Sequence, residues 1–271
     1  MNRKMWRGGT LTCTSRWYNL PLNTTDEPYK RGATDHGSFY SARWRLSMKR
    51  PANIERFGVY RVLRSVYDSY IRKQLPRKIG VYNGVPVRDR ALLDVTDEQP
   101  EYEGPLVRGI EQAVQTGDSV VIVGGGRGVS TVVAARAVGP SGDVRVYEGS
   151  REQYARVEET VQLNRVADRV SVNFEVIGDA VSLWGEGKQA EISDPENLPP
   201  CDVLVLDCEG AEQQVVSELT TPPSTVVVET HGDLGVTPND MIETLESRGY
   251  DVIERETEVP ERGIVILTAR H

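Results

Sequence analysis

The chain has 271 residues, of which 38% are hydrophobic, and its formal net charge is −8. No apolar run approaches the ~18 residues of a membrane-spanning helix, and the start lacks the apolar core of a secretory signal. The cysteines Cys13, Cys201 and Cys208 are odd in number and lack metal-ligand spacing, which argues against a disulfide framework or a zinc site. We therefore expect a soluble, cytoplasmic protein of one or two domains.

Charge is divided unevenly along the chain. Residues 1–100 hold 19 Lys and Arg against 9 Asp and Glu, whereas residues 101–271 hold 13 against 31. Lys188 is the one lysine of the second part. A charged, acidic surface stays hydrated in concentrated salt, so this composition favours a halophilic cytoplasm over an ordinary acidic domain.

Three segments follow one another in the predicted organisation. Residues 1–52 are basic, show no sustained hydrophobic period and are predicted to be largely irregular. Residues 53–115 are predicted to form a helix–hairpin–helix cap over the sheet of a domain that spans residues 116–271.

The predicted cap contains three local signals. Ile54–Leu75 reads as a basic amphipathic helix, which packs against its own domain more often than on an anionic membrane surface. Asn83-Gly84 predicts a two-residue hairpin turn. Pro105 marks the start of a second helix. The arginines and tyrosines of this segment suit a sugar or an acidic glycan as ligand.

The stretch Val120–Thr131 predicts a strand, a tight turn and a helix. Its turn carries Gly124, Gly126 and Gly128 in a Gly-x-Gly-x-Gly pattern. Such glycines let a ligand approach the main chain, and the amides at the start of the next helix face that ligand. A dinucleotide fingerprint would need glycine at Val129, and no Gly-Lys-Ser/Thr is present, so a nicotinamide site and a phosphate-binding P-loop are disfavoured.

An acidic residue ends the next predicted strand, Asp143–Tyr147. This residue, Glu148, lies about 20 positions after the glycine turn, where α/β nucleotide folds bind ribose hydroxyls. The alternative is a solvated carboxylate at the end of a strand. A helix over Arg151–Asn164 and a third strand over Val170–Ile177 follow, and the third strand leads into Gly178-Asp179.

Three carboxylates come after the fourth predicted strand, Asp202–Leu206. They are Asp207, Glu209 and Glu212. Ligands of an open parallel sheet sit outside the carboxyl ends of its strands, so a site is expected here. Asp207 is nearest to the strand and is the stronger functional candidate, whereas the dipole of the following helix is the preferred explanation for Glu212.

The fifth predicted strand, Thr225–Val228, leads into Glu229 and His231. His231 sits at the carboxyl end of a predicted central strand, so a structural and a catalytic role both stay open. Strands over Tyr250–Glu254 and Gly263–Thr268 complete the pattern. The expected fold class is α/β: a doubly wound, mostly parallel seven-stranded sheet with an N-terminal helical and hairpin extension.

Several stretches, in this order, are similar to one protein family. They are Val123–Thr131 with Ala134-Ala135-Arg136, Tyr147-Glu148 with Glu159–Asn164, Gly178-Asp179, Asp207–Glu212 and Glu229-x-His231. The fourth is the most diagnostic, because Asp-Cys-Glu-Gly-Ala-Glu resembles the family's Asp-x-Glu-Gly-Ala-Glu signature. From about Thr116 to His271 the chain resembles class I S-adenosylmethionine-dependent methyltransferases of the FkbM type.

The resemblance implies an S-adenosylmethionine pocket. The three glycines of the turn would line the methionine and ribose part of the cofactor, and Glu148 would hold the ribose hydroxyls. Asp179 would meet the adenine amine. Asp207 would lie close to the sulfonium and the acceptor.

Two positions depart from the family pattern. The family usually has an acidic residue where this chain has Ile122, and commonly has Asn where this chain has Gly126. The missing acid often helps to hold the amino-acid end of the cofactor. Both departures leave open a degenerate member that binds the cofactor, or its product, without turnover.

Methylation of a sugar hydroxyl needs a base for the departing proton. The candidates are His231, Asp207 and Glu229, in that order. Hard cations take clustered carboxylates, so Asp207, Glu209 and Glu229 could supply ligands to Mg²⁺. No strict ligand spacing is present, however, and no metal-ligating residue is assigned from the sequence.

The resulting expectation is an S-adenosylmethionine-dependent O-methyltransferase that acts on a sugar hydroxyl of a glycan or glycolipid. One alternative is methyl esterification of a uronic acid, whose carboxylate needs no base but favours an Arg or Lys partner. The other is the non-catalytic member. Nucleic acid is disfavoured as a partner, because no RNA-binding motif is present and an acidic domain repels a phosphate backbone.

Overall fold

The computed structural model describes residue 65 and residues 67–178 and 190–271. All of them belong to the second of two compact units, Gly58–His271. The predicted irregular segment 1–52, most of the predicted helix Ile54–Leu75 and the predicted adenine contact, Asp179, lie outside the described residues. No described helix is both long and apolar enough to cross a membrane.

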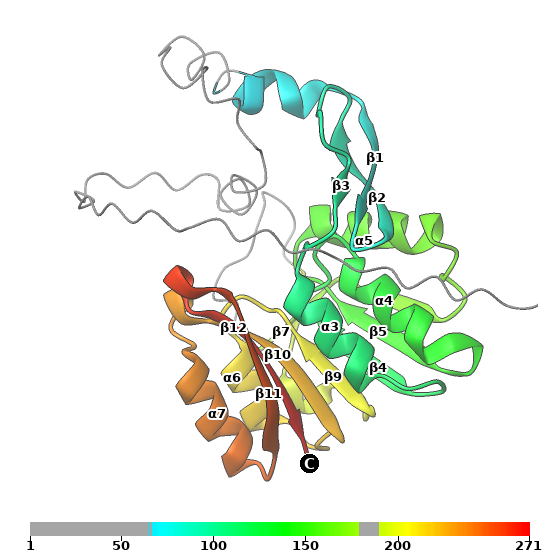
Figure 1. Ribbon diagram of the computed structural model, residues 1–271. Coiled ribbons are helices and arrows are strands. Elements are labelled where there is room, and N and C mark those ends of the chain that lie inside the picture. Colours follow the sequence, from blue (N-terminus) through cyan, green and yellow to red (C-terminus); the bar gives the residue numbers. More distant parts are fainter. Residues whose placement is uncertain (1–64, 66, 179–189) are drawn as a thin grey trace, which may run out of the picture. The chain divides into compact units, whose positions relative to one another are not determined.

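A seven-stranded sheet forms the centre of the described structure (Figure 1). Its strands are β4 (Ser119–Val123), β5 (Asp143–Tyr147), β6 (Val170–Asn173), β9 (Val203–Leu206), β10 (Thr225–His231), β11 (Asp251–Val259) and β12 (Ile264–Arg270). Their order in the sheet is β11-β12-β10-β9-β4-β5-β6. The five strands from β10 to β6 are parallel, and β12 runs antiparallel to both of its neighbours. The predicted mostly parallel, seven-stranded α/β sheet is confirmed.

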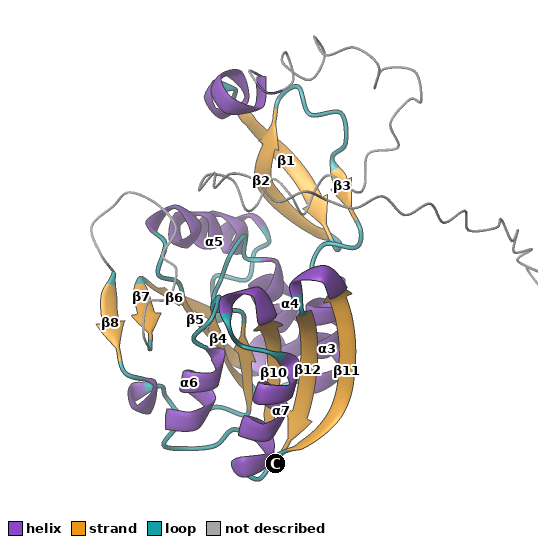
Figure 2. Ribbon diagram, turned by 90° about the vertical axis from the view of Figure 1, so that its left-hand side faces the viewer, coloured by secondary structure: helices purple, strands orange, loops and turns teal. Residues whose placement is uncertain are grey.

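Helices cover both faces of this sheet. One face carries α3 (Gly104–Ala113), α4 (Val129–Val138) and α5 (Arg151–Leu163), and the other carries α6 (Glu212–Glu218) and α7 (Pro238–Ser247) (Figures 1 and 2). Short 3₁₀ turns lie at Gly139–Ser141, Pro195–Asn197, Gly232–Leu234 and Pro260–Arg262. Because both faces are covered, the central strand β9 is continuously apolar, and all four of its residues are buried.

Side chains alternate between the two helical layers. Val121 and Val123 of β4 belong to the core shared with α6 and α7, where Val215, Met241 and Leu245 are fully buried. Successive residues of a strand point to opposite faces, so the residue between those two valines points to the layer of α3 and α4. The sheet is thus wound on both sides, as the alternation of strands and helices along the chain predicts.

The predicted third strand, Val170–Ile177, is in fact two strands. β6 ends at Asn173, and β7 (Glu175–Ile177) pairs in parallel with β8 (Glu191–Ser193) in a separate two-stranded sheet. Phe174 stands at the break, and its ring packs 5.6 Å from the ring of Tyr154 on α5. The segment that the sequence presents as one strand is thus divided at Phe174.

The predicted hairpin is confirmed as β1 (Arg77–Tyr82) and β2 (Val85–Ala91). Asn83 and Gly84 have φ of +46° and +73°, as a two-residue turn of this kind requires. A short strand, β3 (Glu98–Gln99), pairs in parallel with β1. The hairpin packs against α4 and α5 (Figure 1).

The two helices of the predicted cap differ in how well the structure matches the prediction. The described end of its first helix is a π-helical turn, Tyr67–Ile71, followed by a 3₁₀ turn, Arg72–Gln74. The second helix, α3, starts beside Pro105 as predicted and packs on the sheet. A Cβ on Gly109 would lie 2.9 Å from Val227 Cγ1, so glycine allows this close approach. The boundary between segments 53–115 and 116–271 stays a prediction.

Candidate functional site

Four loops converge at the carboxyl edge of the sheet. They follow the adjacent strands β5, β4, β9 and β10. These loops and strand ends carry Glu148, the glycine turn, Asp207, and the pair Glu229 and His231. Because neighbouring parallel strands end at the same edge, the sheet brings together groups that are far apart in the sequence.

The glycine turn is packed tightly against its neighbours. Gly124 has φ of +94°, and a Cβ at this position would lie 2.0 Å from the carbonyl oxygen of Asp207. Gly128 has φ of +79°, and a Cβ there would lie 3.1 Å from Thr160 Cβ. Both positions therefore need glycine, for their backbone conformation and for the space that they leave.

Gly126 is different, although it lies in the same turn. Its φ is +52°, in the left-handed region, and a Cβ there would meet no atom within 4 Å. Asn is the residue that best tolerates this conformation after glycine. The departure from the family's Asn thus leaves the turn geometry intact and leaves open space beside it.

Glu148 closes the turn from the neighbouring strand. Its Oε2 accepts hydrogen bonds from the amides of Gly125 and Gly126, each at 3.0 Å, and its Oε1 accepts one from Ser150 at 2.8 Å. The side chain is buried, so it is not a solvated carboxylate at a strand end. Burial raises the pKa of Glu148, and the three amide hydrogen bonds only partly oppose that rise.

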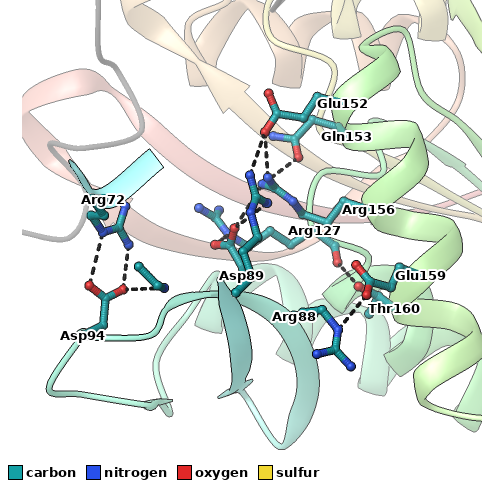
Figure 3. A network of polar contacts seen from close by, with 12 residues as sticks. Arg72, Arg88, Asp89, Asp94, Arg127, Glu152, Gln153, Arg156, Glu159 and Thr160 are labelled. Atoms are coloured by element: carbon teal, nitrogen blue, oxygen red, sulfur yellow. Dashed lines mark hydrogen bonds and ion pairs between the residues drawn. The ribbon is translucent and has the colours of Figure 1, made fainter. Parts of the chain in front are cut away.

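Arg127 ties the glycine turn to the hairpin (Figure 3). Its Nε donates to Asp89 Oδ2 at 2.8 Å, and its Nη1 donates to the Tyr102 hydroxyl at 3.1 Å. Asp89 also pairs with Arg156 at 3.3 Å and Arg77 at 3.7 Å. Burial alone would raise the pKa of Asp89, but the charges of Arg127 and Arg156 outweigh it and hold the pKa below its usual value.

This network is not predicted from the sequence. The one feature of the sequence that indicates it is Arg127, a long cationic side chain in a turn that otherwise consists of glycines. The partner carboxylate, Asp89, lies 38 positions earlier in the chain, and nothing in the spacing of the two residues indicates contact.

A second group of side chains lies where β10 extends beyond the end of the neighbouring strand β9. β9 ends at Leu206, opposite Val228, so the last three residues of β10 extend beside the loop that begins at Asp207. Glu229 and His231 alternate along the strand and so share one face. His231 Nε2 lies 3.5 Å from Asp207 Oδ1 and 3.6 Å from Glu229 Oε1. The structure brings together all three candidates for the base.

Glu212 holds the other side of the imidazole. Its side chain is fully buried, and its Oε1 lies 2.7 Å from His231 Nδ1. Both of its oxygens also accept from the amide of Gly210, at 3.1 and 2.9 Å. Glu212 does stand in the first turn of α6, as the helix-dipole explanation expects, but it also orients the histidine. The signal that could have identified it is its place as the last acid of the Asp-x-Glu-Gly-Ala-Glu stretch.

The charges around His231 shift its pKa. Burial alone would lower the pKa of His231, but the hydrogen bond and charge of Glu212, together with the charges of Glu229 and Glu209, outweigh burial and raise it. Glu209 also contributes to the raised pKa of Glu148. The group around His231 and the group around Glu148 are therefore close enough to share the field of one carboxylate.

Ile122 stands where the family that the sequence resembles usually has an acidic residue. Ile122 is fully buried in β4, where it pairs with Val146 on one side and Val205 on the other. This position is thus occupied by a core residue. The turn amides, the start of α4 and Asp207 remain as polar groups at that edge.

Searches of protein-family models and of curated proteins gave no match. Among solved structures, the chain is similar to an S-adenosylmethionine-dependent O-methyltransferase of Thermotoga maritima, with 20% identity and a TM-score of 0.44 over 62% of this chain and 65% of that one. It is also similar to a precorrin-6y C5,15-methyltransferase of Geobacter metallireducens, with 15% identity and a TM-score of 0.46 over 68% and 95% of the two chains.

A third similar structure is the fibrillarin of Aeropyrum pernix with natively bound S-adenosyl-L-methionine. It has 14% identity and a TM-score of 0.42, over 71% of this chain and 82% of that one. At these identities the likeness is one of fold alone. Activity and acceptor are therefore inferred from the residues of this chain.

Proposed function

We propose that this protein is an S-adenosylmethionine-dependent O-methyltransferase of the FkbM type, with a sugar hydroxyl as acceptor. The observation that carries the proposal is that two groups of residues lie side by side at one edge of the sheet. One group is a glycine turn closed by Glu148, and the other is a buried imidazole, His231, that Glu212 holds in place.

The glycine turn has the features of a cofactor site. Three of its neighbouring amides already bind the Glu148 carboxylate, so that carboxylate is fixed beside the open space at Gly126. Its remaining lone pairs are available to ribose hydroxyls. The first turn of α4 points amides toward the same edge, where they favour the carboxylate of the methionine part. Asp179 is proposed to meet the adenine amine, and Asp207 to lie at the sulfonium.

The imidazole has the features of an acceptor site. Its Nδ1 is bound to Glu212, so its Nε2 faces Asp207 and Glu229. In methyl transfer the carbon–sulfur bond breaks as the oxygen–carbon bond forms, and the hydroxyl proton passes to a base. Deprotonated His231 is the proposed base. The enzyme otherwise supplies alignment of oxygen, methyl carbon and sulfur.

The acceptor class follows from charge rather than from a sugar-specific contact. Asp207, Glu212 and Glu229 surround the imidazole, and a uronic acid carboxylate brought to Nε2 would meet this negative field. A neutral hydroxyl avoids that repulsion. This favours hydroxyl methylation over carboxyl esterification. The acidic, lysine-poor sheet domain further suggests that assays be run in concentrated KCl, as for a halophilic protein.

Calorimetric titration of the purified full chain with S-adenosylmethionine, and separately with NAD, tests the cofactor. We expect binding of S-adenosylmethionine alone, and loss of that binding in Glu148→Ala. Glu243→Ala, an exposed acid on α7, is the matched control and should bind as the native chain does. A folded protein that does not bind S-adenosylmethionine would overturn the proposal.

Methyl incorporation from labelled S-adenosylmethionine into a panel of sugars tests the acceptor. A product stable to base is an ether and supports hydroxyl methylation, whereas a base-labile product is an ester and supports the uronic acid alternative. Cofactor binding with no incorporation into any acceptor class would favour the non-catalytic member, which Ile122 motivates.

A further inference from the structure

The cluster formed by Asp207, Glu229 and His231 has the geometry of a metal site. One carboxylate oxygen from each acid and one nitrogen of the imidazole all lie within 4.8 Å of one another. Glu229 is fully buried and His231 is 4% exposed, so two of the three groups are held by the protein core.

The orientation of the imidazole is fixed independently of this cluster. Glu212, which is not one of the three groups, lies 2.7 Å from Nδ1 and is itself held by the Gly210 amide. A carboxylate at Nδ1 keeps the proton on that nitrogen and leaves the lone pair on Nε2. Within the described structure the contacts recorded for Nε2 are the carboxylates of Asp207 and Glu229, and the side chain is 4% exposed.

The lone pair on Nε2 is therefore directed at two carboxylate oxygens. The distances are 3.5 Å to Asp207 Oδ1 and 3.6 Å to Glu229 Oε1. Three ligand atoms that surround one divalent ion tetrahedrally at about 2.1 Å lie about 3.4 Å apart. The two separations from Nε2 match that spacing, and the two carboxylate oxygens lie within 4.8 Å of each other. The separations from Nε2 are too long for good hydrogen bonds to either carboxylate.

We propose that Asp207, Glu229 and His231 bind a first-row divalent metal ion, with Glu212 orienting the histidine. One nitrogen and two oxygens make a mixed ligand set that suits Mn²⁺ or Zn²⁺ better than Mg²⁺, which prefers oxygen ligands alone. This set differs from the all-carboxylate Mg²⁺ set suggested by sequence, because His231 takes the place of Glu209.

The proposal replaces His231 as the base in the chemistry at this edge. The ion would hold an acceptor hydroxyl and lower its pKa, so that the hydroxyl loses its proton to solvent before the methyl group is transferred. A metal ion and a proton compete for the same lone pair on Nε2. A metal-loaded site would therefore not use His231 as the base. This role of the ion rests on the proposed function, whereas its binding does not.

Metal binding can be measured without catalysis. The full chain, freed of metal with EDTA and dialysed, is titrated with MnCl₂, ZnCl₂ and MgCl₂ by calorimetry. We expect one Mn²⁺ or Zn²⁺ per chain, and at least about tenfold weaker binding of Mg²⁺. His231→Gln and Asp207→Asn should each weaken Mn²⁺ binding at least about tenfold.

Matched variants keep the test specific. His271→Gln replaces a histidine packed on the Tyr250 ring, and Glu243→Gln replaces an exposed acid, and both should bind Mn²⁺ as the native chain does. Circular dichroism establishes that each variant is folded. Pulsed electron paramagnetic resonance of Mn²⁺ bound to the native chain should show coupling to an imidazole nitrogen, and this coupling should vanish in His231→Gln.

Either of two results would overturn the metal site. One is a folded native chain that binds no Mn²⁺ or Zn²⁺, in which case the carboxylates hold an imidazolium instead. The other is Mn²⁺ binding that His231→Gln leaves unchanged. Titration with S-adenosylmethionine in EDTA separates the two proposals, because cofactor binding without metal binding removes only the metal site, and the reverse removes only the proposed function.

Discussion

The two parts of the candidate site are built in different ways. Around the glycine turn, one carboxylate, Glu148, is bound by three backbone amides, and the turn is further held by Arg127. Around His231, side chains from three separate elements meet, and carboxylates outnumber the imidazole. The glycine turn is held by local backbone hydrogen bonds, whereas the contacts around His231 exist because the strand order brings distant residues together. Substitutions should therefore affect folding most on the turn side and pH dependence most on the histidine side.

The largest effect is expected from Asp89→Ala. This change leaves Arg127 buried without its closest carboxylate, and breaking a buried ion pair from one side costs about 3–5 kcal/mol of unfolding free energy. Urea denaturation checks this value. Asp143→Ala, which removes a largely exposed acid 3.8 Å from Arg145, should cost less than about 1 kcal/mol. Equal losses in the two variants would mean that the hairpin does not support the turn.

Gly124→Ala comes next in size. The added methyl would clash with the Asp207 carbonyl at a positive φ, so we expect a loss of at least about 2 kcal/mol of unfolding free energy. Gly126→Asn is the matched variant in the same turn and should cost about 1 kcal/mol or less, because its φ is in the left-handed region and the space is open. Denaturation curves measured side by side compare them. The same cost at both positions would contradict the described turn.

The histidine side is tested by pH. Because the pKa of His231 is raised in the folded state, its contribution to stability is fully present below the ordinary histidine pKa and is lost as pH rises through the raised value. Glu212→Gln removes the main charge that raises it, so this loss of stability above about pH 6.5 should shrink. Urea midpoints between pH 5 and 9 measure the effect. Glu218→Gln, at the exposed end of α6, should leave the profile unchanged.

The smallest effect concerns cofactor affinity on the turn side. The raised pKa of Glu148 means that its carboxylate gains a proton at higher pH than an ordinary glutamate does. S-adenosylmethionine binding should therefore weaken a few-fold as pH falls from neutral through that pKa, because the protonated acid is a poorer acceptor for ribose hydroxyls. Calorimetry between pH 5 and 8 checks this. Affinity that does not change over that range would argue against Glu148 as the ribose ligand.

The sequence predicts the turn side better than the histidine side. Positive φ values and tight packing leave glycine as the suitable residue at Gly124 and Gly128, so their pattern is visible in the chain itself. The sequence also predicts the seven strands, but it ends two of them early: β10 continues past Val228 to His231, and β11 past Glu254 to Val259. It also misses the break at Phe174. The ring contact with Tyr154 at that break is one that no local pattern records.

The contacts of Glu212 and Arg127 could not be predicted for a related reason. Each touches a partner brought close by strand order or by a hairpin, and not by sequence spacing. The catalytic candidates Asp207, Glu229 and His231 could be listed because each follows a predicted strand. Their separations, and the nitrogen that faces the two acids, follow only from the register of β10 against β9.

The part of β10 that extends beyond β9 also bears on how the residues of such a site can change while the sheet stays the same. Thr225–Val228 are paired on both sides, whereas Glu229 and His231, although buried, pair only with β12 and lie beyond the end of β9. Thr230, between them, binds the carbonyl oxygen of Val265 and keeps the strand in register with β12. Substitution of Glu229 and His231 would thus change the chemistry at this edge without changing the fold.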